Sequence, residues 1–376
     1  MGDGEQLIPV PVCVHRTDHD VRTPQGLTPG SRSWLPPNRL ADGEGVRHRR
    51  EAYAERMLDA EAMLRGASRP LVLGMGGGGD VVGALATAEH GRLYDGWDPV
   101  LGGLSWERRP IDPVPGPRTV SEIADAEELA PGVMLAGAET RVRGRDVFFA
   151  ESRMAQFLAQ QTILIDVTRG PAAIASSLGR AVALLNCDLV VFVDVGGDVL
   201  ADGQESGLRS PLCDALMLAV AERMRCEGQS VLAGVFGIGC DAELTPSEVL
   251  ARIAKVASAG GLCGARGLTA PVADRLEGAI ALVPTEASAQ AVHAFRGAHG
   301  MAEIRGGARE LELSPAAALT MYLDVAVMIE ATGRLARAVD AAAGLEEANE
   351  ALHEIGVRTE LDLERNAART ATASNL

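Results

Sequence analysis

Any fold for this chain must accommodate four consecutive glycines, which follow a short apolar run and precede Asp80. Apolar and small residues then continue at helical spacing over residues 81–86, so the pattern predicts a strand, a tight turn and the N-terminus of a helix. Glycine has no Cβ atom, and the first turn of a helix offers free N–H groups at the positive end of its dipole. We therefore expect Gly76, Gly77, Gly78 and Gly79 to bind an anion such as a phosphate.

Strand-like and helix-like segments alternate after this turn. Runs rich in apolar and β-branched residues predict strands at residues 71–75, 99–105, 133–138, 162–167, 188–195, 230–236 and 279–283. The segments between them favour helices, among them residues 121–129 and, from the capping box of Thr245 and Glu248, residues 246–258. This alternation predicts an α/β fold with a doubly wound, mostly parallel, Rossmann-like sheet, whose ligands bind beyond the carboxyl ends of the strands.

The two ends of the chain depart from this alternation. Residues 1–66 predict an irregular N-terminal arm, rich in Pro, Gly, Asp and Arg, followed by a lead-in helix. Residues 67–313 are then the Rossmann-like ligand-binding domain, and residues 314–376 are a helical C-terminal region packed on it, with a long helical stretch over residues 314–343. Leu319, Leu323, Val327 and Ile329 recur at helical spacing, which predicts a face in the core or in a homo-oligomer contact.

The composition excludes several classes of function. A formal net charge of −16 argues against general nucleic-acid binding, which needs a basic surface. Lys255 is the sole lysine, and Asp80 stands where a P-loop has its lysine. Six cysteines without a C-x-x-C pair indicate thiols in a reducing compartment, and no apolar run reaches the ~18 residues of a membrane span. We expect a soluble, cytoplasmic protein with a small anionic ligand and no nucleic-acid or membrane partner.

Four carboxylates, Asp194, Asp198, Asp202 and Glu205, follow one another at the end of a predicted strand. Oxygen ligands suit a hard cation such as Mg²⁺ or Mn²⁺, which takes one or two carboxylates together with substrate phosphate and water. We expect Asp80, Asp194 and Asp198 to bind the cation. Asp80 and Asp198 would also position water or substrate, and Glu205 is the candidate catalytic base. The alternative is that Asp194 and Asp198 cap N–H groups while Asp202 and Glu205 are solvated.

Residues 74–79 also match the G-x-G-x-x-G pattern of dinucleotide-binding turns. Such a turn needs an acidic residue at the end of the second strand to bind the ribose, and Glu107 stands there, with Arg108 and Arg109 available for a 2′-phosphate. Against an NAD(P) site, Asp80 would place a negative charge beside the pyrophosphate. Both an NAD(P) site and a simple phosphate site therefore stay open, as does a purely structural turn.

Two further loops carry charged residues at predicted strand ends. Arg209 stands at the entry of a predicted helix, where its guanidinium suits an anionic group of a substrate. Asp241 and Glu243 precede the helix that begins after Thr245. We expect these two acids to compensate the dipole of that helix, and we prefer this role to one in a binding or catalytic site.

The motifs in these loops resemble those of an uncharacterised family, the domain of unknown function 1152. The matching segments are Leu73-Gly-Met-Gly-Gly-Gly-Gly-Asp-Val-Val82, Gly102-Gly-Leu-Ser-Trp-Glu-Arg108, Asp112-Pro-Val-Pro-Gly-Pro117, Asp194-Val-Gly-Gly-Asp198, Glu205-Ser-Gly-Leu-Arg-Ser-Pro211 and Gly237-Ile-Gly-Cys-Asp-Ala-Glu-Leu-Thr245. The resemblance covers roughly residues 70–330. It implies a Rossmann-like fold and does not imply a reaction.

Three hypotheses about function follow from these residues. The first is an enzyme that acts on a small phosphorylated or nucleotide-like metabolite by group transfer or hydrolysis, assisted by Mg²⁺ or Mn²⁺. The second is an NAD(P)-dependent oxidoreductase that uses Glu107 on the ribose. The third is a non-catalytic protein that binds a nucleotide or metabolite and whose carboxylates only shape the pocket.

Overall fold

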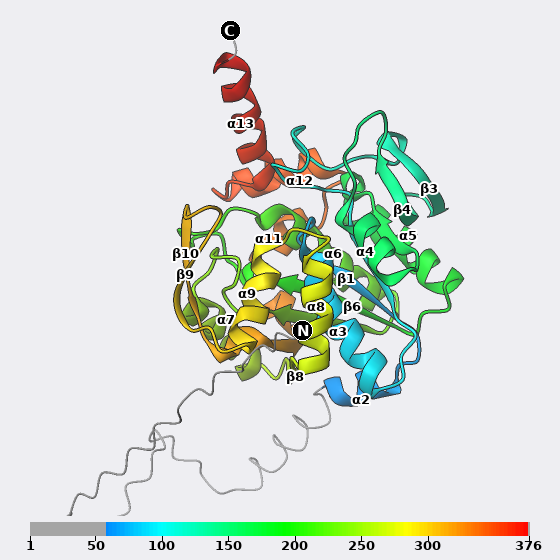
Figure 1. The fold of residues 1–376 in the computed structure, drawn as a ribbon, viewed down its shortest axis with the longest axis vertical. Coiled ribbons are helices and arrows are strands. Elements are labelled where there is room, and N and C mark those ends of the chain that lie inside the picture. The colour runs from blue at the N-terminus through cyan, green and yellow to red at the C-terminus, as the bar shows by residue number, and fades with distance from the viewer. Residues whose placement is uncertain (1–57, 375–376) are drawn as a thin grey trace, which may run out of the picture. The chain divides into compact units, whose positions relative to one another are not determined.

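A computed structural model describes residues 58–374, and the expected N-terminal arm lies largely outside these residues. A nine-stranded mixed sheet forms the centre (Figure 1). The strands are β1 (Pro70–Gly74), β2 (Val100–Leu104), β3 (Ile123–Ala130), β4 (Val133–Val142), β5 (Thr162–Ile165), β6 (Leu189–Val195), β7 (Val231–Phe236), β8 (Leu262–Gly267) and β11 (Leu319–Leu323). A separate hairpin consists of β9 (Gly300–Ile304) and β10 (Arg309–Leu313).

The order of strands across the sheet is β3-β4-β5-β2-β1-β6-β7-β11-β8. The five central strands from β5 to β7 run parallel, and two strands on each side of them pair antiparallel. The chain adds β2 and β5 on one side of β1, and β6 and β7 on the other. The order therefore reverses between β1 and β6, which is the position where open α/β sheets bind their ligands. The predicted α/β, Rossmann-like fold is confirmed.

Helices cover both faces of the sheet. One face packs against α2 (Ala60–Gly66), α3 (Asp80–Tyr94), α4 (Ala150–Leu158), α8 (Ala270–Ile280) and α9 (Glu286–Phe295). The other packs against α5 (Pro171–Leu184), α6 (Pro211–Cys226), α7 (Pro246–Ser258), α10 (Val325–Ala331), α11 (Arg334–Val339) and α12 (Leu345–Glu354). Alternate side chains of β1 enter the two cores, with Leu71 and Leu73 on the α6 side and Val72 on the α3 side. All five residues of β1 are buried, as expected for a strand covered on both faces.

Several predicted elements are confirmed and several are wrong. Helix α7 begins at Pro246 with the predicted capping box of Thr245 and Glu248. The helix predicted at residues 121–129 is instead the 3₁₀ turn η1 (Val120–Glu122) followed by β3. Its Ala and Glu residues favour a helix, but pairing with β4 outweighs that local preference. The strand predicted at residues 279–283 is wrong because its apolar start is the buried end of α8.

The predicted long helix over residues 314–343 is wrong at its start. The short 3₁₀ turn η4 (Pro315–Ala318) leads into β11, which pairs with β7 and with the unpredicted strand β8. Leu319 and Leu323 therefore lie on a strand of the main sheet, and they share no helical face with Val327 and Ile329. From β11 onward the chain is helical and ends with α13 (Glu360–Ser374), which projects from the body in Figure 1.

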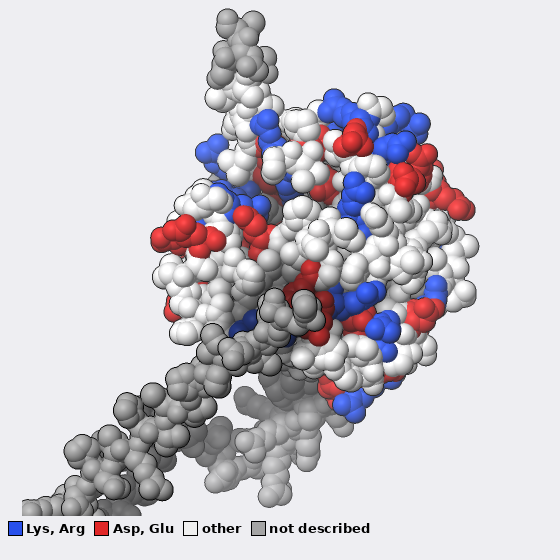
Figure 2. Space-filling model, in the orientation of Figure 1, with Lys and Arg blue, Asp and Glu red and all other residues white. Residues whose placement is uncertain are grey.

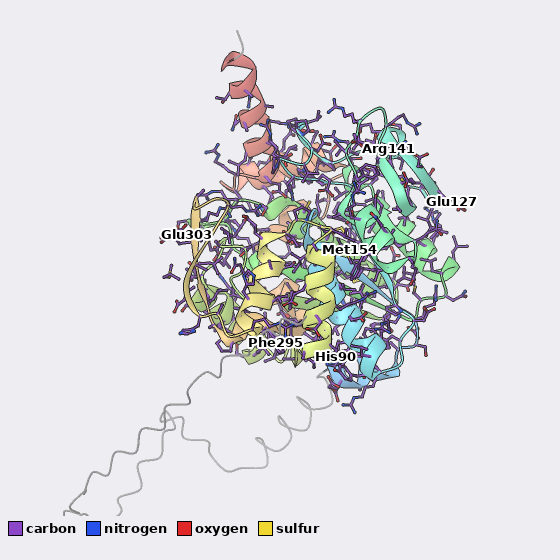
Figure 3. All side chains as sticks on the ribbon, viewed as in Figure 1. His90, Glu127, Arg141, Met154, Phe295 and Glu303 are labelled. Carbon is purple, nitrogen blue, oxygen red and sulfur yellow. The ribbon has the colours of Figure 1, made fainter. Side chains whose placement is uncertain are left out.

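Two hairpins extend the body at opposite edges of the view. Glu127 on β3 and Arg141 on β4 lie at one edge of Figure 3, and Glu303 on β9 lies at the other. On the described part of the face in Figure 2, acidic and basic side chains lie intermingled, and the basic ones form no continuous stripe there. Every helix among the described residues is too short or too polar to span a bilayer.

Candidate functional site

Acidic side chains gather where the strand order reverses. Asp80 begins α3 directly after the glycine turn, Asp194 is the penultimate residue of β6, and Asp214 lies in the first turn of α6. One carboxylate oxygen of each lies within 4.8 Å of an oxygen of the other two. Asp194 and Asp214 are 1% and 2% exposed, and Asp80 is partly buried. We call Asp80, Asp194 and Asp214 the first carboxylate group.

Several oxygens of this group have no hydrogen-bond partner among the described residues. Both oxygens of Asp194 and the Oδ1 of Asp214 are buried and unpartnered. Buried carboxylate oxygens are normally hydrogen-bonded or bound to a cation, because water no longer solvates them. A purely structural role therefore does not account for the unpartnered oxygens of the first carboxylate group.

The surroundings favour the neutral form of these acids in the cation-free protein. Burial raises the pKa of Asp80 to about 7. Burial and the charge of Asp80 raise the pKa of Asp194 to about 8. Burial, followed by the charges of Asp194 and Asp80, holds the pKa of Asp214 well above the usual range of a carboxyl. A divalent cation would reverse this preference, since it stabilises the ionised form.

The glycine turn already binds the carboxyl group of Asp80. The Oδ2 of Asp80 accepts a hydrogen bond of 2.9 Å from the amide of Gly76, and the amide of Gly78 donates to the carbonyl of Trp106 at 3.0 Å. Gly77 and Gly78 have φ values of 79° and 54°, which favour glycine. A Cβ on Gly79 would lie 2.4 Å from the side chain of Thr285. A phosphate on the Gly76 amide would have to displace Asp80, so the expected anion site stays a prediction.

A second carboxylate group, Asp198, Asp241 and Glu243, lies at the ends of β6 and β7. These side chains are buried, and their oxygens also lie within 4.8 Å of one another. Asp198 begins the 3₁₀ turn η3 (Asp198–Leu200), and burial together with the charges of its acidic neighbours raises its pKa well above the usual range. The predicted trio of cation ligands is thus divided, with Asp80 and Asp194 in the first group and Asp198 in the second.

Glu243 has a different role from the one expected. Its Oε2 accepts hydrogen bonds from the amides of Arg209 and Ser210 at 2.6 and 2.8 Å, and its Oε1 accepts one from the Ser210 hydroxyl at 2.6 Å. These donors directly precede α6, which begins at Pro211. The carboxylate therefore holds the segment that enters α6, whereas the position of Glu243 before α7 suggested compensation of the α7 dipole.

Glu205 is not brought into either group. Its Oε1 lies 2.7 Å from the guanidinium of Arg252, and its oxygens also accept hydrogen bonds from the amides of Asp202, Gly203 and Gln204. Asp202 binds the same guanidinium nitrogen at 2.6 Å. These partners hold the loop before α6, and this geometry favours a structural role for Glu205 over the predicted role of catalytic base.

Arg209 and Glu107 also have other partners. The guanidinium of Arg209 donates to the carbonyls of Ser206 and Leu208 in its own loop. The Oε1 of Glu107 accepts a 2.5 Å hydrogen bond from the amide of Ala150 at the start of α4. Glu107 is 6% exposed, and burial raises its pKa to about 7. Their partners favour structural roles for both, so the substrate-anion role of Arg209 and the ribose role of Glu107 stay predictions.

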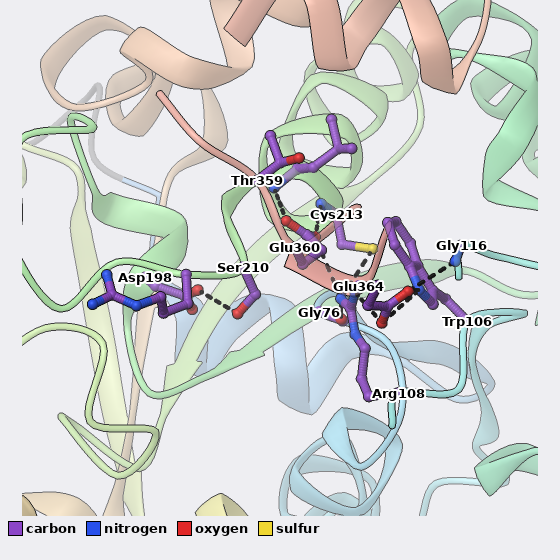
Figure 4. Close-up of polar contacts among 12 residues, drawn as sticks. Gly76, Trp106, Arg108, Gly116, Asp198, Ser210, Cys213, Thr359, Glu360 and Glu364 are labelled. Atoms are coloured by element: carbon purple, nitrogen blue, oxygen red, sulfur yellow. Dashed lines mark hydrogen bonds and ion pairs between the residues drawn. The ribbon is translucent and has the colours of Figure 1, made fainter. Parts of the chain in front are cut away.

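Arg108, which the sequence suggested only for a 2′-phosphate, is a cation whose charge acts on Asp80. Figure 4 shows its guanidinium between the glycine turn and α13, where it donates to the carbonyl of Gly76 at 2.7 Å and pairs with Glu360 at 3.3 Å. It also lies 4.2 Å from the ring of Trp106. Its Nη1 is buried and has no hydrogen-bond partner. Arg108 therefore offers a fixed positive charge and an available donor.

The start of α13 holds this arrangement together. The carboxylate of Glu360 accepts hydrogen bonds of 2.9 Å from the amides of Leu212 and Cys213 in the first turn of α6. Glu364 accepts from the indole of Trp106 and from the amide of Gly116 (Figure 4). The C-terminal helix thus joins the loops that follow β2 and β6.

Sequence reasoning missed Asp214 among the ligands of the first group. A signal was present, because the helix starting after Pro211 follows a β-strand of the parallel sheet. The N-terminal turn of such a helix lies at the carboxyl edge of the sheet, beside the other loops. Glu360 had no comparable signal, since its contact with α6 joins residues 147 and 148 positions apart.

Comparison with known proteins supports the resemblance stated above. A family model described as a protein of unknown function (DUF1152) matches residues 71–368. The chain belongs to this family. The match extends beyond residue 330 and includes the glycine turn, both carboxylate groups and the start of α13. Neither the comparison with curated proteins nor that with solved structures finds a match, so the chemistry of DUF1152 has to be argued from the geometry of this site.

Proposed function

We propose that this chain is a divalent-cation-dependent enzyme that acts on a small phosphorylated or nucleotide-like metabolite by group transfer or hydrolysis. The observation that carries the proposal is the first carboxylate group, in which Asp80, Asp194 and Asp214 lie within 4.8 Å of one another. The buried oxygens of Asp194 and Asp214 that accept no hydrogen bond are suited to bind a cation.

The charges within the group explain why a cation would bind there. With oxygens no more than 4.8 Å apart, two ionised carboxylates repel by at least about 3 kcal/mol at an effective dielectric constant of about 20. One divalent cation replaces this repulsion by attraction. Oxygen ligands without sulfur or imidazole favour Mg²⁺ or Mn²⁺ over softer metals. The cation would supply Lewis acidity and bind a substrate phosphate oxygen together with the protein ligands.

Arg108 is the residue best placed to bind the anionic part of the substrate. Its guanidinium lies against the carbonyl of Gly76, directly beside the turn that carries Asp80, and its Nη1 donates no hydrogen bond and lies 3.8 Å from the Oε1 of Glu364. A guanidinium suits phosphate oxygens because it offers several N–H donors in one plane. We therefore assign to Arg108 the anion-binding role that the sequence suggested for Arg209.

A thermal-shift screen tests the proposal. The purified protein is heated with nucleotides, sugar phosphates or NAD(P), each with and without Mg²⁺ or Mn²⁺. A ligand at 100 times its dissociation constant stabilises the fold by about 2.7 kcal/mol. We expect Mn²⁺ alone to raise the melting temperature and a phosphorylated ligand to raise it further only when the cation is present. Compounds found in this way are then assayed for turnover.

Two variants form a matched pair in this screen. Asp194→Asn is expected to lose the Mn²⁺ shift and the turnover, whereas Glu205→Gln keeps both because its carboxylate is bound to Arg252. A cation-independent shift with NAD(P) would support the oxidoreductase instead. A cation-dependent shift with no turnover of any ligand would support the non-catalytic binding protein. Loss of the Mn²⁺ shift in Glu205→Gln alone would contradict the assignment of the site.

Other expectations from the sequence accompany this proposal and stay predictions. They are a cytoplasmic location, a small anionic ligand without a nucleic-acid partner, and a possible homo-oligomer formed through the C-terminal helices. The exposed part of α13 beyond Arg365 is the segment on which the oligomer prediction now depends.

A further inference from the structure

The second carboxylate group contains an unpartnered oxygen of its own. Asp241 is 7% exposed, and its Oδ2 is buried without a hydrogen-bond partner, whereas its Oδ1 accepts from the amide of Glu243 at 3.1 Å. Asp198 and Glu243 approach Asp241 within 4.8 Å. A buried carboxylate oxygen without a donor is unfavourable. The donors before α6 satisfy the buried carboxylate of Glu243. The buried Oδ2 of Asp241 has no such donor.

Little positive charge balances this group. Within the described residues its single ion pair joins Arg309 on β10 to Glu243, with 3.4 Å between Nη1 and Oε1. The side chain of Arg309 is 25% exposed and contacts the edge of the group. Three carboxylates thus share one partly solvated guanidinium, and Asp198 and Asp241 form no ion pair in this part of the chain.

Asp194 connects the second group with the first. Its charge interacts with that of Asp80 in the first group and with those of Asp198 and Asp241 in the second. Both of its oxygens are buried and unpartnered. A carboxylate with two available oxygens can bind one cation through each of them.

Backbone hydrogen bonds join the end of β6 to β7 and to the loop after β7. The amide of Gly196 donates to the carbonyl of Phe236 at 2.9 Å, and the amide of Gly239 donates to the carbonyl of Gly196 at 2.7 Å. A Cβ on Gly196 would lie 2.2 Å from the carboxyl carbon of Asp241. The ends of β6 and β7 are therefore held in contact, and their acids cannot separate to reduce repulsion.

We propose that the two groups bind two divalent cations side by side, with Asp194 as the ligand between them. This inference rests on the function proposed above, which needs only a cation at the first group. Paired cations in proteins lie about 3.5–4 Å apart and stabilise both the attacking and the leaving oxygen at a phosphoryl centre. Together with the phosphorylated substrate proposed above, a pair of cations favours a phosphate ester or anhydride as the bond that is cleaved. Asp198 and the unpartnered Oδ2 of Asp241 would bind the second cation, since both oxygens of Glu243 already accept hydrogen bonds.

The number of bound Mn²⁺ ions tests the inference on the full chain. Isothermal titration with Mn²⁺ gives the stoichiometry, and electron paramagnetic resonance of the loaded protein shows whether neighbouring ions are spin-coupled. We expect two Mn²⁺ per chain with a coupled spectrum. One Mn²⁺, or two without coupling, overturns the paired centre and leaves the proposed function standing. No bound Mn²⁺ contradicts both.

Variants assign the two ions to the two groups. Asp241→Asn is expected to retain one Mn²⁺ and to lose the coupled spectrum, whereas Asp202→Asn retains two because Asp202 is paired with Arg252. If Asp241→Asn does not fold, Asp198→Asn takes its place. Two coupled ions in a folded variant of the second group would overturn the assignment of that group.

Discussion

Two sets of acidic side chains follow one another at the end of β6 and in the loop after it, and they differ in what neutralises them. Asp202 and Glu205 share the guanidinium of Arg252, at 2.6 and 2.7 Å. Asp194 and Asp198 form no ion pair with any described arginine, and both oxygens of Asp194 are unpartnered. All four side chains are carboxylates. Arg252 on α7 neutralises Asp202 and Glu205, which makes them a structural pair, and the acids without such a partner are candidates for a cation site.

This contrast shows which carboxylates are available for chemistry. A carboxylate that accepts hydrogen bonds from amides and a guanidinium has used the lone pairs that a cation would need. Glu205 is of this kind, although its position after a β-strand made it a reasonable candidate for a base. Changes of pH and single substitutions should therefore act differently on the paired and the unpaired carboxylates.

The pH dependence of stability is expected to be dominated by the unpaired set. The pKa of an aspartate is about 3.9 in an unfolded chain, and burial raises those of Asp80 and Asp194 to about 7 and 8. Between pH 4 and 8, roughly, the folded protein thus binds more protons than the unfolded chain, so the free energy of unfolding falls as the pH rises. In EDTA we expect a loss on the order of several kcal/mol, and a smaller loss in Mg²⁺. Urea unfolding at several pH values measures both.

A double variant serves as the control for this pH dependence. Asp80→Asn combined with Asp194→Asn removes two of the titrating groups, and the slope of the unfolding free energy against pH in EDTA should become shallower. An equal or steeper slope in the double variant would show that these two acids do not titrate as the structure indicates.

Asp194→Asn is expected to stabilise the cation-free protein. The amide removes a charge that nothing neutralises and adds donors for Asp80 and Asp198, so the free energy of unfolding at pH 8 in EDTA should rise by about 1–3 kcal/mol. In saturating Mg²⁺ the order reverses, because the variant has lost the cation. Denaturant unfolding in EDTA and in Mg²⁺ measures the change in the free energy of unfolding in each condition. A lower stability of the variant in EDTA would contradict the claim that the charge of Asp194 is not neutralised.

Glu205→Gln is expected to act in the opposite direction. The amide of the new side chain would face N–H donors of the loop and of Arg252, so the free energy of unfolding should fall by about 1–3 kcal/mol. This loss should be equal with and without Mg²⁺, since Glu205 is not expected to contact a cation. A loss that appears only in the presence of Mg²⁺ would place Glu205 in the cation site after all.

The smallest effect is expected at Arg309, on the edge of the second group. Arg309→Gln should change the free energy of unfolding by no more than about 0.5 kcal/mol, because the pair with Glu243 is long and partly solvated. The affinity for Mn²⁺ should rise a few-fold, since a competing positive charge has gone. Arg305→Gln, which removes an exposed pair with Glu286 on the turn of the same hairpin, is the control and should leave the affinity unchanged.

Prediction from the sequence was most successful where the signals are local. The strand at residues 188–195, the turn at Gly76 and the capped start of α7 were found because periodicity, glycine and a capping box act within a few residues. It failed at β3, where pairing with the next strand outweighs a local preference for helix, and at β11, where pairing with the distant β7 decides the structure. The polar residues of β3 and the small residues before β11 carry no strand pattern of their own.

Local sequence patterns were enough to predict the α/β class, the glycine turn and the placement of Asp80, Asp194 and Asp198 at the carboxyl edge of the sheet. Which acids meet and which are neutralised depends on contacts between distant parts of the chain. Arg252 reaches Glu205 across 47 residues, and Glu360 reaches the start of α6 across 147 or more. Local patterns determine where along a strand or loop a side chain lies. The charged group that it contacts comes from another part of the chain, and that group determines whether the side chain is neutralised or available to a ligand.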